Sequence, residues 1–186
     1  MNVDLDLITA CINRERKAEY ELYKLTYSYL MSICFRYTHS RENAEEILNI
    51  GFLKALKNLD KYRPEIPFKI WIRKVMINVL IDEYRKEKKH KENIEYVEEY
   101  EETMDSAVEN NIIAKMNAEE IYELIVKLPP MSQKVFNLYV IDGFSHKEIA
   151  GMLDMSEGTS KWHLNSSRNK LKEMIHKLIV PLKAAI

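Results

Sequence analysis

The chain has 186 residues, a net charge of −1 and a hydrophobic content of 46%. This length and composition suit one or two small domains with buried cores, and the charge excludes a uniformly basic nucleic-acid binder. The sequence has no apolar run as long as a membrane span and no basic, apolar start typical of a signal peptide, so we expect a cytoplasmic protein without a membrane span.

Apolar residues recur at helical spacing along the first half, and no long alternating run indicates a strand. The pattern predicts helices over residues 5–12, 15–37, 41–59 and 67–89. Ser40 is expected to cap the third, and Pro67 is tolerated in the first turn of the fourth. The residues expected on the buried faces of the second and third helices are Tyr20, Tyr23, Leu30, Cys34, Ala44, Ile47, Leu48, Phe52, Ala55 and Leu59.

The two cysteines, Cys11 and Cys34, are too few for a disulfide framework. Neither has a Cys or His partner at the spacing of a metal site. We therefore expect both to be small core residues, and we expect no metal or other cofactor.

Charge is segregated at the end of the fourth helix. Residues 69–91 are rich in lysine and arginine, whereas residues 92–109 are rich in glutamate. The acidic stretch has no clear period, which is typical of a solvated linker. We therefore predict a first domain over 1–91, an acidic linker over 92–105 and a second domain over 106–186.

The second half is also expected to be helical. A helix over 106–128 should stop at Pro129, and another should restart at Ser132. Asp142 and Gly143 form a turn, and Pro181 is expected to end the last helix. The residues expected to be buried after Ser132 are Val135, Phe136, Leu138 and Tyr139.

Residues 144–172 have the pattern of two helices joined by a tight turn. Ser145 with Glu148 would form a capping box at the first helix, and Ser156 would cap the second. This layout predicts a helix-turn-helix that presents a polar, partly basic helix to the DNA major groove. The apolar stripe of the second helix is Leu164, Leu171, Ile175 and Leu178, and the residues facing outward are Lys161, Trp162, Asn165 and Asn169.

Motifs in both halves together resemble the extracytoplasmic-function (ECF) group of the bacterial sigma-70 family. The resemblance implies an all-α fold with a region-2 four-helix domain and a region-4 helix-turn-helix domain joined by the acidic linker. It also implies a factor, not an enzyme, that binds core RNA polymerase and directs it to promoters. The motif segments are residues 43–55, 58–63, 67–72, 128–130 with Phe136, 145–153 and 157–161.

In the first half, the resemblance implies docking of residues 41–59 on the clamp of the largest polymerase subunit through Glu45, Glu46 and Asn49. The family usually has Gln and then Glu where this chain has Asn49 and Ile50. An alternative is that Glu45 and Glu46 are solvated residues that favour the helix dipole.

The loop and the fourth helix would open the minus-ten element and hold its non-template strand. Capture of a single strand needs a basic groove, an aromatic platform and amides for an extruded base. Tyr62 with Asn58 and Asn78 would form the pocket, although aromatic residues in a helical stripe, here Phe68 and Trp71, can also be core. The residues expected to line the track are Trp71, Arg73, Lys74, Arg85 and Lys86.

In the second half, the helix-turn-helix would contact the minus-35 element as duplex, and the domain would meet the polymerase flap. Lys161 and Asn165 are the expected base contacts, and Trp162 could meet a thymine methyl group or a sugar. The family often has arginine at Ser166 and alanine at Ser167, which predicts one missing phosphate clamp. Many relatives also bind an anti-sigma factor. The expected phosphate contacts are Ser156, Thr159 and Arg168.

Parts of the sequence are also compatible with two other functions. Paired Glu-x-x-His motifs, Glu87 with His90 and Glu173 with His176, are typical of di-iron enzymes in helical bundles. Helical geometry places Glu173 and His176 away from the apolar stripe, and Glu87 and His90 are expected among lysines in water, which argues against a core metal site. A helix-turn-helix regulator that binds duplex DNA alone would explain residues 106–180 but not the first half.

Overall fold

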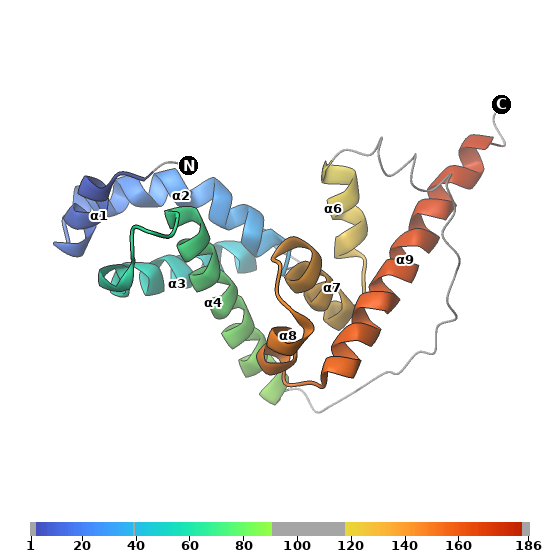
Figure 1. Ribbon diagram of the computed structural model, residues 1–186. Coiled ribbons are helices and arrows are strands. Elements are labelled where there is room, and N and C mark those ends of the chain that lie inside the picture. The colour runs from blue at the N-terminus through green and yellow to red at the C-terminus, as the bar shows by residue number, and fades with distance from the viewer. Residues whose placement is uncertain (1–2, 39, 91–117, 184–186) are drawn as a thin grey trace. The chain divides into compact units, whose positions relative to one another are not determined.

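The computed structural model describes residues 3–38, 40–90 and 118–183. Its contacts divide the chain into two units, Met1–Glu92 and Asn93–Ile186 (Figure 1), and each is considered by itself. In the described ranges all regular elements are helical, which confirms the predicted fold class. None of these helices is both long and apolar enough to cross a membrane. The acidic stretch 92–105 and residues 106–117 of the expected helix lie outside the described residues.

The first unit is built from four α-helices and a short 3-10 turn. Helix α2 packs against α1, α3 and α4, and α3 also packs against α4. Ser40 Oγ accepts from the amide of Asn43 at 3.1 Å, as expected of an N-cap. The elements are α1 (Leu5–Ile12), α2 (Arg16–Phe35), α3 (Arg41–Lys57), η1 (Leu59–Lys61) and α4 (Phe68–His90).

Buried aliphatic side chains from α2, α3 and α4 form the core of this unit. Gly51 allows α3 to approach α4 closely, because a Cβ atom there would lie 2.5 Å from the Cε of Met76. The side chains with the least exposure include Leu22, Leu30, Ile33, Leu48, Leu59, Ile72, Met76 and Ile77.

Two expectations for this unit are wrong. Tyr20 is 63% exposed, because the buried stripe of α2 runs through Ala18 and Leu22 and leaves Tyr20 on the opposite side. The Nζ of Lys24 lies 4.7 Å from the centre of its ring. Leu59 is buried, but it belongs to η1 and not to α3, which ends at Lys57.

Cys34 is fully buried in this core, with its Sγ 3.6 Å from the Sδ of Met76. Burial raises the pKa of the Cys34 thiol to about 12, and burial also raises that of Cys11 to about 11. Because the thiolate is the reactive form, we expect neither thiol to react with a disulfide reagent at pH 8 in the folded protein. Chain unfolded in guanidinium should label at both positions within minutes. Rapid labelling of Cys34 in the native protein would contradict this burial.

The second unit contains four described α-helices and one π-helical turn. Helix α9 packs against α7, α8 and α6. Val135, Leu138, Ile149, Leu153 and Leu164 form its main buried core, and Leu124 and Ile175 form a smaller cluster with Leu171 and Met174. The elements are α6 (Ala118–Val126), α7 (Pro130–Phe136), η2 (Asn137–Ile141), α8 (His146–Leu153) and α9 (Glu157–Lys183).

Several boundaries and faces in this unit differ from expectation. Helix α7 begins at Pro130 and not at Ser132, because proline suits the first helical position. The wider π turn η2 changes which side chains face the core, so Phe136 is half-buried and Tyr139 is 36% exposed. Helix α9 passes Pro181 and ends at Lys183, since a proline in a last turn removes only one amide donor.

Candidate nucleic-acid interface

Helices α8 and α9 form the predicted helix-turn-helix (Figure 1). The capping box is present: the Glu148 amide donates to Ser145 Oγ at 3.3 Å, and the Ser145 amide donates to Glu148 Oε2 at 2.9 Å. Asp154 then adopts a left-handed conformation with φ of 55°, which is why the chain turns within three residues. The short turn fixes where α9 begins.

The start of α9 is capped as its sequence predicts. The Thr159 amide donates to Ser156 Oγ at 2.9 Å, and the two hydroxyl oxygens lie 2.8 Å apart. Ser156 is exposed and Thr159 is half-buried. A capped helix start with exposed hydroxyl and amide groups is a suitable place for a DNA phosphate.

One face of α9 carries the expected base contacts. Lys161, Asn165 and Arg168 are all exposed, and their spacing of four and three residues places them on one side of the helix. Trp162 beside them is half-buried, with its ring 4.9 Å from that of His163. The face therefore offers an ammonium, an amide and a guanidinium, the donors that suit base edges and phosphates in a major groove.

The opposite face of α9 is buried and partly polar. Ser160 and Ser167 are fully buried, and Ser166 is only 7% exposed. The Ser167 hydroxyl lies 2.8 Å from both the Ser132 carbonyl and the His163 carbonyl, to which it donates. Both positions serve packing and neither serine is exposed to a phosphate, so the missing phosphate clamp at Ser166 and Ser167 stays a prediction.

The apolar stripe of α9 was predicted correctly only in part. Leu164 and Ile175 are buried and Leu171 is partly buried, but Leu178 is 52% exposed. Leu178 lies beyond Ile175, which is the last residue of α9 in the cluster with Leu124 of α6.

In the first unit, three aromatic side chains gather where the loop meets α4. The ring of Tyr62 lies 5.3 Å from Phe68 and 5.5 Å from Trp71, both edge to face. The Tyr62 hydroxyl donates to the Ile66 carbonyl at 2.9 Å, which holds the loop around the ring. Phe68 is buried and so is part of the core, whereas Tyr62 and Trp71 are half-buried and keep ring surface for a base.

The two asparagines of the predicted pocket differ in what they do. Asn58 donates from Nδ2 to the Lys54 carbonyl at 2.8 Å and accepts at Oδ1 from Lys61 Nζ at 2.8 Å. Its amide is therefore occupied at the end of α3. Asn78 is exposed two turns after Trp71, so it lies on the same side of α4.

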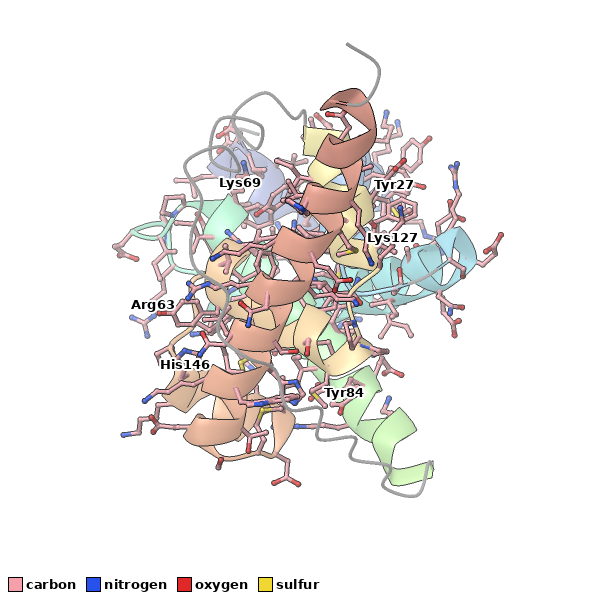
Figure 2. All side chains as sticks on the ribbon, turned by 90° about the vertical axis from the view of Figure 1, so that its right-hand side faces the viewer. Tyr27, Arg63, Lys69, Tyr84, Lys127 and His146 are labelled. Carbon is pink, nitrogen blue, oxygen red and sulfur yellow. The ribbon has the colours of Figure 1, made fainter. Side chains whose placement is uncertain are left out.

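The basic track along α4 is exposed for most of its length. Lys74, Arg85 and Lys86 are exposed and Arg73 is half-buried. Lys86 Nζ lies 2.6 Å from Glu83 Oε1, and this hydrogen bond raises the lysine pKa. The Nζ of Lys69 lies 4.8 Å from the centre of the Tyr29 ring. Lys69 follows Phe68 in the chain and so adds a cation near the aromatic cluster of Tyr62, Phe68 and Trp71; Lys69 and Arg63 are labelled in Figure 2.

The expected docking residues of α3 contact tyrosines of α2. The Tyr23 hydroxyl donates to Asn49 Oδ1 at 3.0 Å, and the Tyr27 hydroxyl donates to Glu45 Oε1 at 3.3 Å. Arg41 Nε also donates to Glu45 at 2.9 Å and holds the pKa of that carboxyl below its usual value. Tyr23 was expected only as a core residue and Tyr27 was not expected at this surface, although their spacing of four residues places both on one face of α2.

The exposed part of this surface of α3 is acidic and apolar. Glu46 is exposed, and so are the side chains of Ile50 and Leu53, at 39% and 58%. Apolar side chains left in water beside Asn49 are suited to contact with another protein. The departure at Ile50 therefore adds apolar area to the expected docking surface.

The alternative metal site has no support among the described residues. They contain no group of three or more His, Cys, Asp and Glu side chains close enough to hold an ion. Glu173 instead accepts from Lys170 at 2.9 Å and from Lys177 at 2.6 Å, and these hydrogen bonds lower its pKa to about 2. The side chains of Glu87 and His90 lie outside the described part of the structure.

Comparisons with known proteins match both units. The family profile of Sigma-70 region 2 matches residues 22–90, and that of Sigma-70 region 4 matches residues 118–171. RNA polymerase sigma factor YlaC of Bacillus subtilis (strain 168) is 26% identical over 165 residues, 88% of this chain and 95% of that protein. ECF RNA polymerase sigma factor SigW of the same strain is 26% identical over 157 residues, 80% of this chain and 84% of the relative.

A solved structure has a similar fold. The sigma factor RpoE from Bartonella quintana, determined in complex with the anti-sigma factor NepR, matches 84% of this chain and 96% of its own, with 18% identity and a TM-score of 0.50. The helix-turn-helix, the aromatic and basic surface of α4 and these matches define a transcription initiation factor, not an enzyme. The chain belongs to the sigma-70 family, and within that family to the ECF group.

Proposed function

We propose that this chain is an ECF sigma factor that binds core RNA polymerase, directs it to particular promoters and assists strand opening. The observation that carries the proposal is the presence, in one chain, of a capped helix-turn-helix with exposed donors and of an aromatic cluster beside a basic helix. Duplex DNA suits the first surface and an unpaired strand suits the second. Such a factor works in the cytoplasm, where polymerase and DNA meet.

We assign the roles by unit. Residues 1–91 dock on the clamp of the largest polymerase subunit and open the minus-ten element, and residues 106–186 bind the minus-35 element and the flap. Residues 92–105 connect them. Glu45, Glu46 and Asn49 carry the docking contacts. The DNA contacts are Tyr62, Trp71, Arg73, Lys74, Asn78, Arg85 and Lys86 in the first unit and Ser156, Thr159, Lys161, Trp162, Asn165 and Arg168 in the second.

The occupied amide of Asn58 makes it the weakest member of the minus-ten pocket. Its hydrogen bonds to Lys54 and Lys61 fix the orientation of the amide and leave only one N–H and one lone pair for an incoming base. We therefore assign base contact in this pocket to Tyr62 and Asn78, with Asn58 ordering the loop. Regulation by an anti-sigma factor is also part of the proposal, since the similar RpoE was solved with one.

The test is transcription with purified core polymerase. We expect the full chain to give RNA from a small subset of a template library with randomised upstream sequences, and core polymerase alone to give none. Absence of stimulation on every template would contradict the proposal. Tight binding to duplex DNA without polymerase, together with no stimulation, would instead favour the helix-turn-helix regulator.

A further inference from the structure

Two histidine–serine pairs connect the buried side of α9 to the elements packed against it. His146 Nδ1 lies 2.9 Å from Ser160 Oγ, which joins the start of α8 to the first turn of α9. His163 Nδ1 lies 3.0 Å from Ser132 Oγ, which joins α9 to α7. The Ser167 hydroxyl, donating to the Ser132 carbonyl at 2.8 Å, adds a second link to α7.

The pairs lie on the face of α9 opposite the exposed donors. Ser160, His163 and Ser167 are spaced by three and four residues and form one stripe, whereas Lys161, Asn165 and Arg168 form the exposed stripe. Both serines of the buried stripe are fully buried, so each hydroxyl requires a partner within the protein. The rotation of the exposed stripe about the helix axis is therefore coupled to these hydrogen bonds.

Hydrogen bonds add a directional restriction to the one that apolar packing imposes. Leu164 is held by close contact with its neighbours, and a hydroxyl and an imidazole nitrogen must in addition stay within a narrow distance and direction. A side chain lies about 5 to 6 Å from the helix axis, so a rotation of about 20° moves it by about 2 Å. A shift of that size separates a donor from a base edge.

Each histidine is also held by an aromatic ring. Tyr139 stacks on His146 with ring centres 4.4 Å apart and an angle of 22°, and His146 is labelled in Figure 2. Burial, followed by the charges of Lys161 and Arg168, lowers the pKa of His146 despite the opposing charge of Glu157. The lowered pKa favours the neutral imidazole, in which Nδ1 accepts from the Ser160 hydroxyl in one tautomer and donates to it in the other.

We propose that His146 and His163 are positioning residues for promoter recognition, which hold α9 at the rotation where its exposed stripe meets the bases. The inference rests on the proposed function. On this inference the two histidines affect discrimination between promoter sequences without contacting DNA. His146 acts through Ser160, and His163 acts through Ser132. The packing of the helix-turn-helix limits the rotation of α9, and the two hydrogen-bonded pairs narrow it further.

The test measures initiation by the full chain with core polymerase from two templates, one with the upstream element selected from the library and one with that element replaced. The ratio of the two rates does not depend on the fraction of folded protein, so it separates positioning from stability. We expect His163→Ala and His146→Ala each to lower this ratio about tenfold, since one lost base contact costs that much discrimination.

Three further variants make the result specific. His163→Asn places an amide near the position of Nδ1 and should recover most of the ratio. Combining His163→Ala with Ser132→Ala should lower it no further than His163→Ala alone, because the two residues act as a pair. His176→Ala, an exposed histidine later in the same helix, should keep the wild-type ratio.

A wild-type ratio in both histidine-to-alanine variants would overturn the inference, and so would an equal fall in His176→Ala. Failure of His163→Asn to improve on His163→Ala would also count against it. A wild-type protein that initiates on neither template overturns the proposed function and this inference with it. Initiation by the wild type that ignores the upstream element overturns the inference and the assignment of minus-35 binding to residues 106–186, but leaves the stimulation of core polymerase intact.

Discussion

Replacing Tyr62 with alanine is expected to reduce promoter opening about tenfold or more, because stacking of one base on an aromatic ring contributes about 1 to 3 kcal/mol. Tyr62 is half-buried, and its ring meets Phe68 and Trp71 edge to face. The cluster holds the ring in place before DNA arrives. An extruded base can therefore stack on it without first ordering the side chain.

The defect should be confined to the opening step. We expect Tyr62→Ala to discriminate between templates with and without the upstream element as well as the wild type does, because Lys161 and Asn165 belong to the other unit. Opening can be followed by the fluorescence of 2-aminopurine placed in the minus-ten element. A template with a premelted bubble should restore most of the initiation, since the strands are already separate.

Two controls separate the ring from the fold. Tyr62→Phe removes only the hydroxyl that donates to the Ile66 carbonyl, so it should retain most of the opening. Tyr20→Ala removes a tyrosine of the same unit that is 63% exposed on α2, and it should open promoters normally. If Tyr62→Ala and Lys161→Ala failed at the same step, the proposed division of labour would be wrong.

Periodicity was sufficient to predict most helices, because each buries one apolar stripe. The expected helix over 5–12 has the same bounds as α1, and the caps at Ser40 and Ser145 are present. Some errors arose where a local departure changed the phase or the end of a helix. The π turn η2 exposed Tyr139, and α9 continued past Pro181.

The candidate site was less accessible from the sequence, because its hydrogen bonds join residues far apart in the chain. Exposure of Lys161 and Asn165 follows from the apolar stripe of α9. The bond between Tyr23 and Asn49, or between Ser132 and His163, has no local signal, since both partners are ordinary polar residues until the fold brings them together. The same limit applies to Asn58, whose amide is occupied at the end of α3.

Replacing Lys161 or Asn165 with alanine is expected to lower discrimination for the upstream element by about tenfold or more, because a good contact to a base edge contributes about 1 to 3 kcal/mol. Both side chains are exposed one turn apart on the free face of α9. Their loss removes donors without leaving a buried group unpaired. We therefore expect little change in thermal stability.

Arg168→Ala provides the contrast, since a phosphate contact carries no sequence information. It should lower the initiation rate equally on the template with the matched upstream element and on the template with the replaced one. It should also lower the slope of log binding constant against log salt concentration by about one. Lys127→Ala, at an exposed lysine at the end of α6 that Figure 2 labels, is the control for charge and should change neither quantity. If Lys161→Ala and Asn165→Ala weakened both templates equally, these side chains would be phosphate contacts, and base recognition would have to lie elsewhere on α9.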